Sequence, residues 1–247
     1  MRLSTRLLSL SFNMRKIILP VVLFLIVVVL GFSIKKPTSP SPQGPYPSQT
    51  YDAIVESSKE YVPFSPKENA KVSVAYPVLS DSFLSALLKK QAFDRVEAFK
   101  AESLTSRYPD DTNEYTLETD YMREESTAYS TYVFSTYIYT GGAHGNQFRS
   151  TVTFDKAGKL ISLDTLFADT QAALLVVSEY AKQERAGTEF NSDMWLSGLD
   201  PSVDLYNRYI VRDDSLEFLF DPYEIAPYSS GLQKIIIPRS VYQQYLR

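Results

Sequence analysis

The amino-acid sequence predicts an α+β protein in which an N-terminal transmembrane helix precedes two small, mostly antiparallel sheet subdomains, each with a packed helix. Two observations support this fold class. An apolar segment near the start is separated from the rest of the chain by a proline-rich stretch. Beyond it, strand-like segments occur in blocks, with two separate amphipathic segments, rather than in strict strand–helix alternation. The chain has no cysteine, so a hydrophobic core rather than disulfide bonds must hold the fold.

Residues 17–34 form the apolar segment, which carries no charge over its 18 residues. As a helix it would be about 27 Å long, close to the roughly 30 Å of a bilayer core. Basic residues are more numerous before it than after it, so residues 1–16 are expected in the cytoplasm. We therefore predict a signal-anchor, a single-pass location in the cell membrane and an extracytoplasmic C-terminal part. Cleavage at the small residues of 31–33 is the alternative, and initiation at Met1 or at Met14 is also open.

Residues 35–49 are predicted to be a linker between the membrane and the folded part. Five prolines lie between Pro37 and Pro47. This composition favours an extended polyproline II conformation, which rises about 3.1 Å per residue. We expect folded structure to begin near Thr50.

Residues 50–145 are predicted to form the first α+β subdomain. Alternating apolar and polar residues predict short strands over 51–78, with a turn at 63–69. Further strands are predicted over 115–122 and 127–140. The second of these contains β-branched and aromatic residues throughout, which predicts that both of its faces are covered.

A helix is predicted between these strand blocks. Asp81 or Ser82 is its N-cap, and Tyr108–Pro109 ends it. Apolar residues recur at spacings of four and three, as expected for the buried face of an amphipathic helix. This buried stripe is formed by Leu84, Leu88, Ala92, Val96 and Phe99.

Residues 146–247 are predicted to form the second α+β subdomain. Strict alternation around Phe148, Val152 and Phe154 predicts its first strand, and a turn follows at 155–159. A helix is predicted to start at Asp169 or Thr170 and to stop at Gly187. The remaining expectations are a loop with helical turns over 188–204, strands over 216–221 and 235–237, and a helical turn over 242–247.

The charge of the chain limits its partners. After residue 36 there are 29 acidic residues and 19 basic ones. Such an excess of negative charge argues against binding nucleic acid or an anionic lipid surface, and is compatible with a cationic partner. The alternative explanation is that the negative charge only keeps a tethered domain soluble. We therefore predict no nucleic-acid partner.

Three sequence strings carry a resemblance to a known family. They are YTGGAHGN at 139–146, TFDKAGK at 153–159 and FDPYEIAPYSSG at 220–231. In order and spacing they resemble the extracytoplasmic module, a pair of domains of unknown function, shared by RsiV-type anti-sigma factors and PdaC-type peptidoglycan deacetylases. The resemblance covers residues 50–247, with a PdaC-like first subdomain and an RsiV-like second one. It implies an extracytoplasmic location and a ligand that is either lysozyme or cell-wall glycan (peptidoglycan).

His144 is the only histidine of the chain. One imidazole without any cysteine argues against a metal site on chemical grounds, so no metal or cofactor is expected. Acting as a general base, His144 would need a nucleophile and an orienting acid, and the sequence singles out neither. We interpret the neighbouring glycines at 141, 142 and 145 as a tight turn with positive φ angles, held by hydrogen bonds from His144 to the backbone.

The string at 220–231 supplies the second group of candidate residues. Pro222 precedes Tyr223 and Pro227 precedes Tyr228, and the two prolines stiffen this segment. The two rings either stack on a sugar or contact a protein, or they cap the core, with Glu224 anchoring the loop. Together with His144 and Asn146, these three residues are the predicted ligand-binding residues.

These observations predict a membrane-anchored, non-catalytic binding or sensing module of the bacterial cell envelope. Its predicted partners are the membrane, through residues 17–34, and either lysozyme or cell-wall glycan. The first alternative is an enzyme that modifies envelope glycan with His144 and carboxylates, and a second is a structural protein that oligomerises. The acid pairs 110–111, 124–125 and 213–214 are interpreted as turns and solvated edges rather than as a catalytic pair.

Overall fold

The computed structural model describes residues 54–63, 69–105 and 112–247. The expected cytoplasmic N-terminus (1–16), transmembrane segment (17–34) and linker (35–49) lie outside these residues. Within the described part of the chain, no helix has the length and apolar character needed to cross a membrane. The segment Ser48–Arg247 forms one compact unit.

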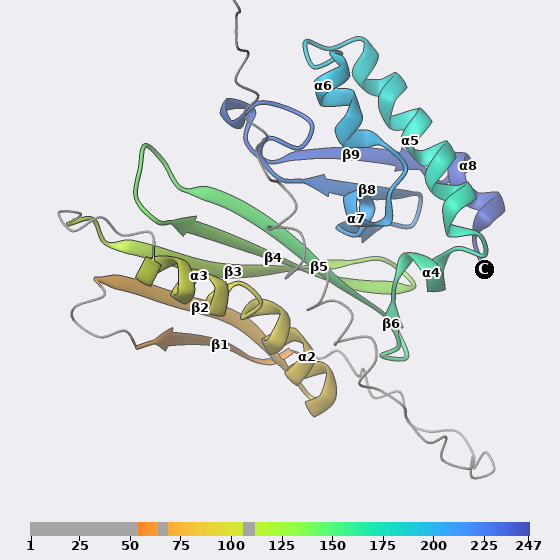
Figure 1. The fold of residues 1–247 in the computed structure, drawn as a ribbon. Helices are drawn as coiled ribbons and strands as arrows, with labels where there is room; N and C mark the ends of the chain where they lie inside the picture. Colours follow the sequence, from red (N-terminus) through yellow and green to blue (C-terminus); the bar gives the residue numbers. More distant parts are fainter. Residues whose placement is uncertain (1–53, 64–68, 106–111) are drawn as a thin grey trace, which may run out of the picture. The chain divides into compact units, whose positions relative to one another are not determined.

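The unit is an α+β structure with two sheets (Figure 1). One sheet has six strands in the order β1-β2-β3-β4-β5-β6, and the other has three in the order β7-β8-β9. Every described strand pair is antiparallel except β2 and β3, which are parallel. The strands are β1 (Ile54–Val62), β2 (Ala70–Leu79), β3 (Tyr115–Glu125), β4 (Tyr129–Tyr139), β5 (Asn146–Asp155), β6 (Leu160–Ile161), β7 (Tyr209–Val211), β8 (Ser215–Phe220) and β9 (Gln233–Pro238). The helices are α2 (Ser82–Ala92), α3 (Val96–Thr105), α4 (Leu163–Leu166), α5 (Thr170–Ala186), α6 (Asp193–Leu196), α7 (Val203–Tyr206) and α8 (Arg239–Tyr242), with 3-10 turns η1 (Ser197–Leu199), η2 (Tyr228–Ser230) and η3 (Gln243–Tyr245).

Helices α2 and α3 cover one face of the six-stranded sheet (Figure 1). The side chain of Asp81 accepts a hydrogen bond from the Leu84 backbone N–H at 2.9 Å, so Asp81 is the N-cap, one of the two residues predicted. The prediction of one continuous helix was wrong, because the chain breaks at residues 93–95. The apolar spacing did not reveal the break, since Ala92 and Val96 on its two sides are both buried in the same core.

A second core lies between helix α5 and the three-stranded sheet. The side chain of Asp169 accepts a hydrogen bond from the Ala172 backbone N–H at 3.0 Å, and Gly187 is the C-cap, so both predicted ends of this helix are confirmed. The short helical turns predicted over 188–204 are also present. Strand β7 and helix α4 were not predicted, because three- and four-residue elements carry too little periodicity to be recognised.

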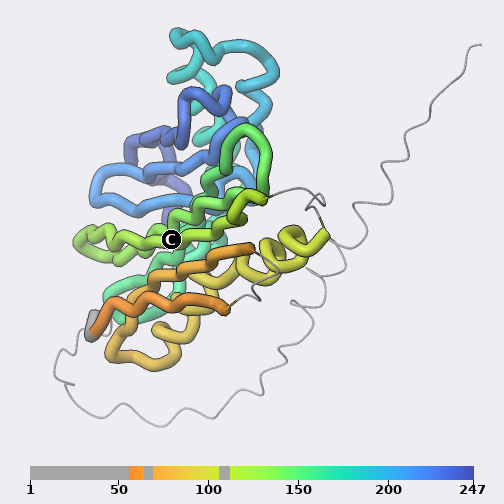
Figure 2. Tube along the Cα trace, turned by 90° about the vertical axis from the view of Figure 1, so that its left-hand side faces the viewer, coloured from red at the N-terminus to blue at the C-terminus, as the bar shows by residue number. Residues whose placement is uncertain are grey.

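The two sheets pack on each other through β4. Tyr132 and Phe134 belong to the core beneath α2 and α3, whereas Val133 packs with Ile210 of β7 and Leu219 of β8. Side chains alternate between the two faces of a strand, so this pattern covers β4 on both faces, as predicted. Figure 2, turned by 90°, also shows the blue strands of the second sheet and the yellow helices on opposite sides of the green strands.

The six-stranded sheet extends across the expected subdomain boundary between residues 145 and 146. Strand β5 pairs with β4 from Ile138↔Asn146 to Tyr129↔Asp155, and β6 continues the sheet. The larger sheet therefore takes strands from both sides of that boundary.

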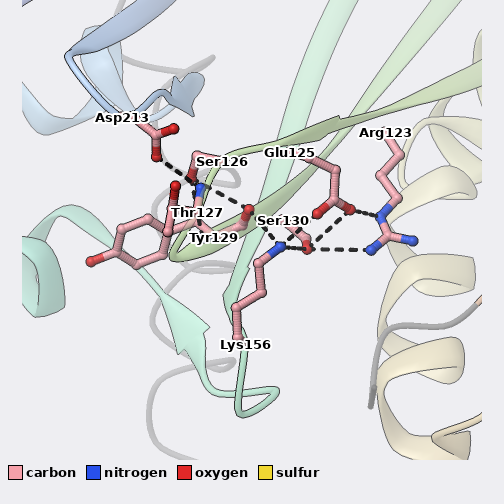
Figure 3. Close-up of polar contacts among 8 residues, drawn as sticks. All are labelled: Arg123, Glu125, Ser126, Thr127, Tyr129, Ser130, Lys156 and Asp213. Carbon is pink, nitrogen blue, oxygen red and sulfur yellow. Dashed lines mark hydrogen bonds and ion pairs between the residues drawn. The ribbon is translucent and has the colours of Figure 1, made fainter. Parts of the chain in front are cut away.

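The hairpin that joins β3 to β4 carries a cluster of charged and polar side chains (Figure 3). Glu125 forms ion pairs with Arg123 and with Lys156, the latter at 2.5 Å. Lys156 also donates to the Ser130 hydroxyl at 3.0 Å, and Asp213 accepts from the Thr127 backbone N–H at 2.8 Å. We call Arg123, Glu125, Ser130 and Lys156 the hairpin cluster.

The acid pairs in this region are more than solvated edges. Glu124 accepts a hydrogen bond from the Arg212 Nη1 at 2.7 Å, and the same arginine donates from Nε to Glu217 at 3.0 Å. Arg212 thus links the larger sheet to strand β8, and Asp213 links the two sheets through Thr127. Glu125, Asp213 and Asp214 are exposed at turns, as interpreted from the sequence. For Glu124 the interpretation was wrong, because its half-buried pairing with Arg212 joins residues far apart in the sequence. The pair at 110–111 lies outside the described residues.

Candidate functional site

The glycine-rich turn between β4 and β5 has two kinds of glycine. Gly141 and Gly142 have φ angles of +89° and +90°, a conformation that only glycine adopts readily, as predicted. Gly145 does not have a positive φ, so its role in the prediction was wrong. A Cβ atom there would come within 2.4 Å of the outer end of the Tyr137 ring, so a larger residue would displace that ring.

The loop that follows β8 is held by a buried ion-pair network. Asp221 accepts hydrogen bonds from the Arg149 backbone N–H at 2.8 Å and from Arg208 Nη1 at 2.7 Å. Arg208 also donates from Nη2 to Glu224 at 2.5 Å, and Glu224 accepts from the Asp221 backbone N–H at 2.7 Å. Burial raises the pKa of the Asp221 carboxyl and outweighs the opposite effect of the Arg208 guanidinium. The network fixes where the loop leaves the sheet.

Three aromatic rings lie together where this loop meets the glycine-rich turn. The centroids of the His144 and Tyr228 rings lie 3.9 Å apart with an interplanar angle of 23°. The Tyr223 ring lies next to Tyr228 on the same surface, tilted by 32°, with its centroid 5.6 Å from that of Tyr228. The Tyr228 hydroxyl donates to the Gly145 carbonyl oxygen at 2.7 Å, and His144 Nδ1 lies 2.9 Å from the same oxygen. We call His144, Tyr228 and Tyr223 the aromatic ladder.

The outer rings of the ladder are open to solvent. His144 is exposed, and 55% of the Tyr223 surface is accessible. Tyr223 also has a φ angle of +73°, which is uncommon for any residue other than glycine and costs about 1–2 kcal/mol. Such backbone strain is found preferentially at functional sites. The fold therefore holds an exposed tyrosine in an unfavourable conformation.

Two hollows adjoin the ladder. The smaller has a volume of about 280 Å³ and contains both His144 and Asn146. The larger, of about 400 Å³, is polar and contains Glu224. Arg95 lines both of them, and its guanidinium lies 3.9 Å from the centroid of the Phe148 ring. The larger hollow, which we call the arginine groove, is lined by Gln91, Asp94, Arg95, Arg149, Ser150, Thr151, Asp204, Asn207, Arg208 and Glu224.

The structure brings four of the five predicted ligand-binding residues to one surface. His144, Tyr223 and Tyr228 form the ladder, and Asn146 lies in the adjoining smaller hollow. Glu224 instead anchors its own loop through Arg208. In the described part of the chain, no group of three or more histidine, aspartate and glutamate side chains is placed to hold a metal ion.

Three arginines of the site were not predicted. Arg95 lies at the break between α2 and α3, Arg149 on β5, and Arg208 just before β7. The signal for Arg149 was that it is the one basic residue in the strand 146–155. For Arg208 the sequence carried no signal, because its partners Asp221 and Glu224 lie 13 and 16 residues away.

Two family models match successive parts of the chain. A family model described as deacetylase PdaC matches residues 65–147, and one described as a protein of unknown function, DUF3298, matches residues 164–240. Over 183 residues the chain is 26% identical to the peptidoglycan-N-acetylmuramic acid deacetylase PdaC of Bacillus subtilis, covering 71% of this chain and 38% of that protein. It is 30% identical over 120 residues to the immunogenic protein MPT64 of Mycobacterium tuberculosis, covering 46% of this chain and 50% of that protein.

Solved structures of DUF3298 proteins share the fold. The one from Pseudomonas aeruginosa matches with a TM-score of 0.59 at 17% identity, covering 81% of this chain and 97% of that chain. The one from Bacteroides fragilis matches with a TM-score of 0.52, also at 17% identity, with 81% and 96% covered. The chain therefore contains a PdaC domain followed by a DUF3298 domain, a combination consistent with a module shared by PdaC-type proteins.

Proposed function

We propose that residues 48–247 are a non-catalytic binding module of the bacterial cell envelope, attached to the membrane by residues 17–34, and that the aromatic ladder binds cell-wall glycan. The observation that supports this best is the ladder itself, in which Tyr223 is exposed and strained while Tyr228 is fixed by a hydrogen bond. The similarity to a deacetylase that acts on peptidoglycan supports the choice of ligand.

The chemistry of the ladder suits a sugar ring. An exposed tyrosine offers a large, rigid and partly apolar surface at a small cost in side-chain entropy. Pyranose rings present a face of C–H groups that packs on such a surface, while their hydroxyl groups need hydrogen-bonding partners beside it. Asn146 and Thr140 line the adjoining smaller hollow and supply such groups.

The most direct test is a calorimetric titration of residues 48–247 with an uncharged β-1,4-linked N-acetylglucosamine oligomer. This fragment is suitable because both hydrophobic cores lie within it. We expect Tyr223→Asn to weaken binding about tenfold through loss of the ring, a change of about 1.4 kcal/mol. Asparagine tolerates a positive φ, so the same substitution should leave stability unchanged or slightly raised.

Tyr61→Asn is the matched control, because Tyr61 is 68% exposed on β1 at the opposite edge of the larger sheet. It should bind the oligomer like the unmodified protein. Absence of oligomer binding by the unmodified protein, or equal losses in the two variants, would overturn the proposal.

The acidic charge of the chain favours a second candidate ligand, a cationic protein such as lysozyme. Binding of this kind should weaken steeply as salt is raised, whereas stacking on a neutral sugar should not. A titration with lysozyme at two salt concentrations separates the two candidates. Loss of lysozyme binding in Tyr223→Asn would show that both ligands use the ladder.

The enzyme alternative makes a different prediction for His144. If the imidazole acts on envelope glycan, His144→Asn removes turnover without weakening glycan binding. If the ladder only binds, no turnover of glycan is detected in the unmodified protein, and His144→Asn changes affinity alone. Product analysis by mass spectrometry distinguishes the two outcomes.

A further inference from the structure

Arg149 differs from Arg208, its neighbour in the arginine groove. Arg208 is 12% exposed and has carboxylate partners on both terminal nitrogens. Arg149 is partly buried as well, yet among the described residues no hydrogen bond or ion pair reaches its guanidinium. Its backbone N–H, not its side chain, contacts Asp221. The half-buried guanidinium of Arg149 thus keeps donors that no described residue uses.

The nearest carboxylate does not fill this gap. One Asp221 oxygen accepts from the Arg149 backbone and the other from Arg208, so the direct contacts of that carboxylate are already in use. Arg95 is in a similar position, because its guanidinium packs on the Phe148 ring and no ion pair to it occurs among the described residues. A guanidinium with free donors binds a carboxylate through short, charge-assisted hydrogen bonds. Two arginines therefore present unused donors to one groove.

The other residues of the groove limit the charge of the ligand. Asp94 and Asp204 also line it and are exposed. A polyanion would meet these two carboxylates and be repelled, whereas one carboxylate between Arg95 and Arg149 would not. The volume of about 400 Å³ accommodates a small acidic substituent together with the water around it. The groove thus fits a monoanionic group.

The groove also lies beside the aromatic ladder. Arg95 lines both the groove and the smaller hollow that contains His144. Glu224 lines the groove and directly follows Tyr223 of the ladder. A ligand that stacks on the ladder can therefore extend a charged substituent into the groove.

We propose that the arginine groove binds the carboxylate of an acidic glycan, with Arg149 and Arg95 as donors, and so makes the module prefer acidic sugars over neutral ones. This inference rests on the proposed function, since the sugar backbone occupies the ladder. In cell-wall glycan the carboxylate comes either from the lactyl ether of a muramic acid residue or from a peptide attached to it. Both sources present the same chemistry to a guanidinium, which binds a carboxylate through two parallel hydrogen bonds.

The test compares three glycans of equal length on residues 48–247: a neutral N-acetylglucosamine oligomer, a peptide-free glycan containing N-acetylmuramic acid, and the same glycan with its peptides. The unmodified protein should bind at least one acidic glycan about tenfold more tightly than the neutral one. Arg149→Gln should remove this preference and leave affinity for the neutral oligomer unchanged. The acidic glycan that shows the preference identifies the source of the carboxylate.

Lys59→Gln is the matched control for the loss of one positive charge. Lys59 is exposed on β1 at the opposite edge of the larger sheet, so the preference should survive there. Equal affinity of the unmodified protein for neutral and acidic glycans, or an unchanged preference in Arg149→Gln, overturns the inference while the proposed function stands. Binding to none of the three glycans overturns both.

Discussion

The hairpin cluster and the arginine groove are both rich in charge, but they use it differently. In the hairpin cluster each charged side chain has a partner, and Glu125 serves both Arg123 and Lys156 (Figure 3). In the arginine groove both terminal nitrogens of Arg208 pair with carboxylates, whereas the guanidinium of Arg149 has no partner among the described residues. Charges that satisfy one another stabilise a turn, whereas charges left unsatisfied are available to a ligand. The hairpin cluster therefore serves as a structural contrast to the groove, which is the proposed binding surface.

The largest effect is expected at Arg208. Arg208→Met would leave Asp221 buried without its cation, and removal of one partner of a buried pair costs about 3 kcal/mol of unfolding free energy. Arg123→Met in the hairpin cluster removes a more exposed partner and should cost less than about 1 kcal/mol. Urea denaturation of the two variants measures the difference. Adding Asp221→Asn to Arg208→Met should restore part of the loss, and failure to do so would contradict the role of the pair.

The backbone at Gly198 packs closely against the backbone at Glu224, a residue that lines the groove. A Cβ atom on Gly198 would lie 1.9 Å from the Glu224 carbonyl oxygen, so the backbone must move to accept it. We expect Gly198→Ala to lower the free energy of unfolding by about 2 kcal/mol. It should also weaken glycan binding, because it displaces the loop after β8 that carries Tyr223 and Tyr228. Gly187→Ala is the control, because a Cβ atom at that position would meet no atom within 4 Å and the φ angle of Gly187 is not positive. That variant should be as stable as the unmodified protein or slightly more so.

Loss of the negative charge of Glu125, which pairs with both Arg123 and Lys156, should change the stability of the protein only slightly. Glu125→Gln weakens two ion pairs that are partly open to solvent, so the expected cost is below about 1 kcal/mol. The cost should fall further in high salt, because exposed charges are screened. Thermal unfolding at low and high salt measures the cost in stability. A calorimetric titration with glycan measures the affinity, which should not change. A large loss of binding would show that the two regions are coupled.

The smallest change in stability is expected at Arg149, the residue proposed to set the preference for acidic glycans. Arg149→Gln removes a partly buried charge without breaking any side-chain hydrogen bond within the described structure, so unfolding free energy should stay within about 0.5 kcal/mol of the original. Burial lowers the pKa of the Arg149 guanidinium, which agrees with an unfavourable environment for its charge. Marked destabilisation in urea would mean that Arg149 is structural, like Arg208.

Local features of the fold could be predicted from the sequence. Alternation identified β3 and β5, and β-branched and aromatic composition identified β4. Side-chain capping identified the starts of α2 and α5, because all these signals arise between residues close in the chain. The break between α2 and α3 escaped prediction because the buried stripe runs through it without interruption.

The site was predictable only in part. The glycine-rich turn and the loop after β8 stood out by composition, and the structure brings them together. Their contact could not be foreseen, since Gly145 and Tyr228 are 83 residues apart. The guanidinium of Arg149, free among the described residues, could not be foreseen either. It is free there because Asp221 already accepts a hydrogen bond from Arg208, which the sequence does not show. A sequence shows which residues are unusual, but not which of them share partners.

The most direct test of the central claim uses the only histidine of the chain as a reporter. The imidazole of His144 stacks on Tyr228, so its proton resonances in an NMR spectrum sense the ladder and nothing else gives a competing histidine signal. On titration with the neutral N-acetylglucosamine oligomer, we predict that these resonances shift and saturate at the ligand concentration at which calorimetry shows saturation. Calorimetric binding without any shift of the His144 resonances would contradict the claim that the ladder is the binding site.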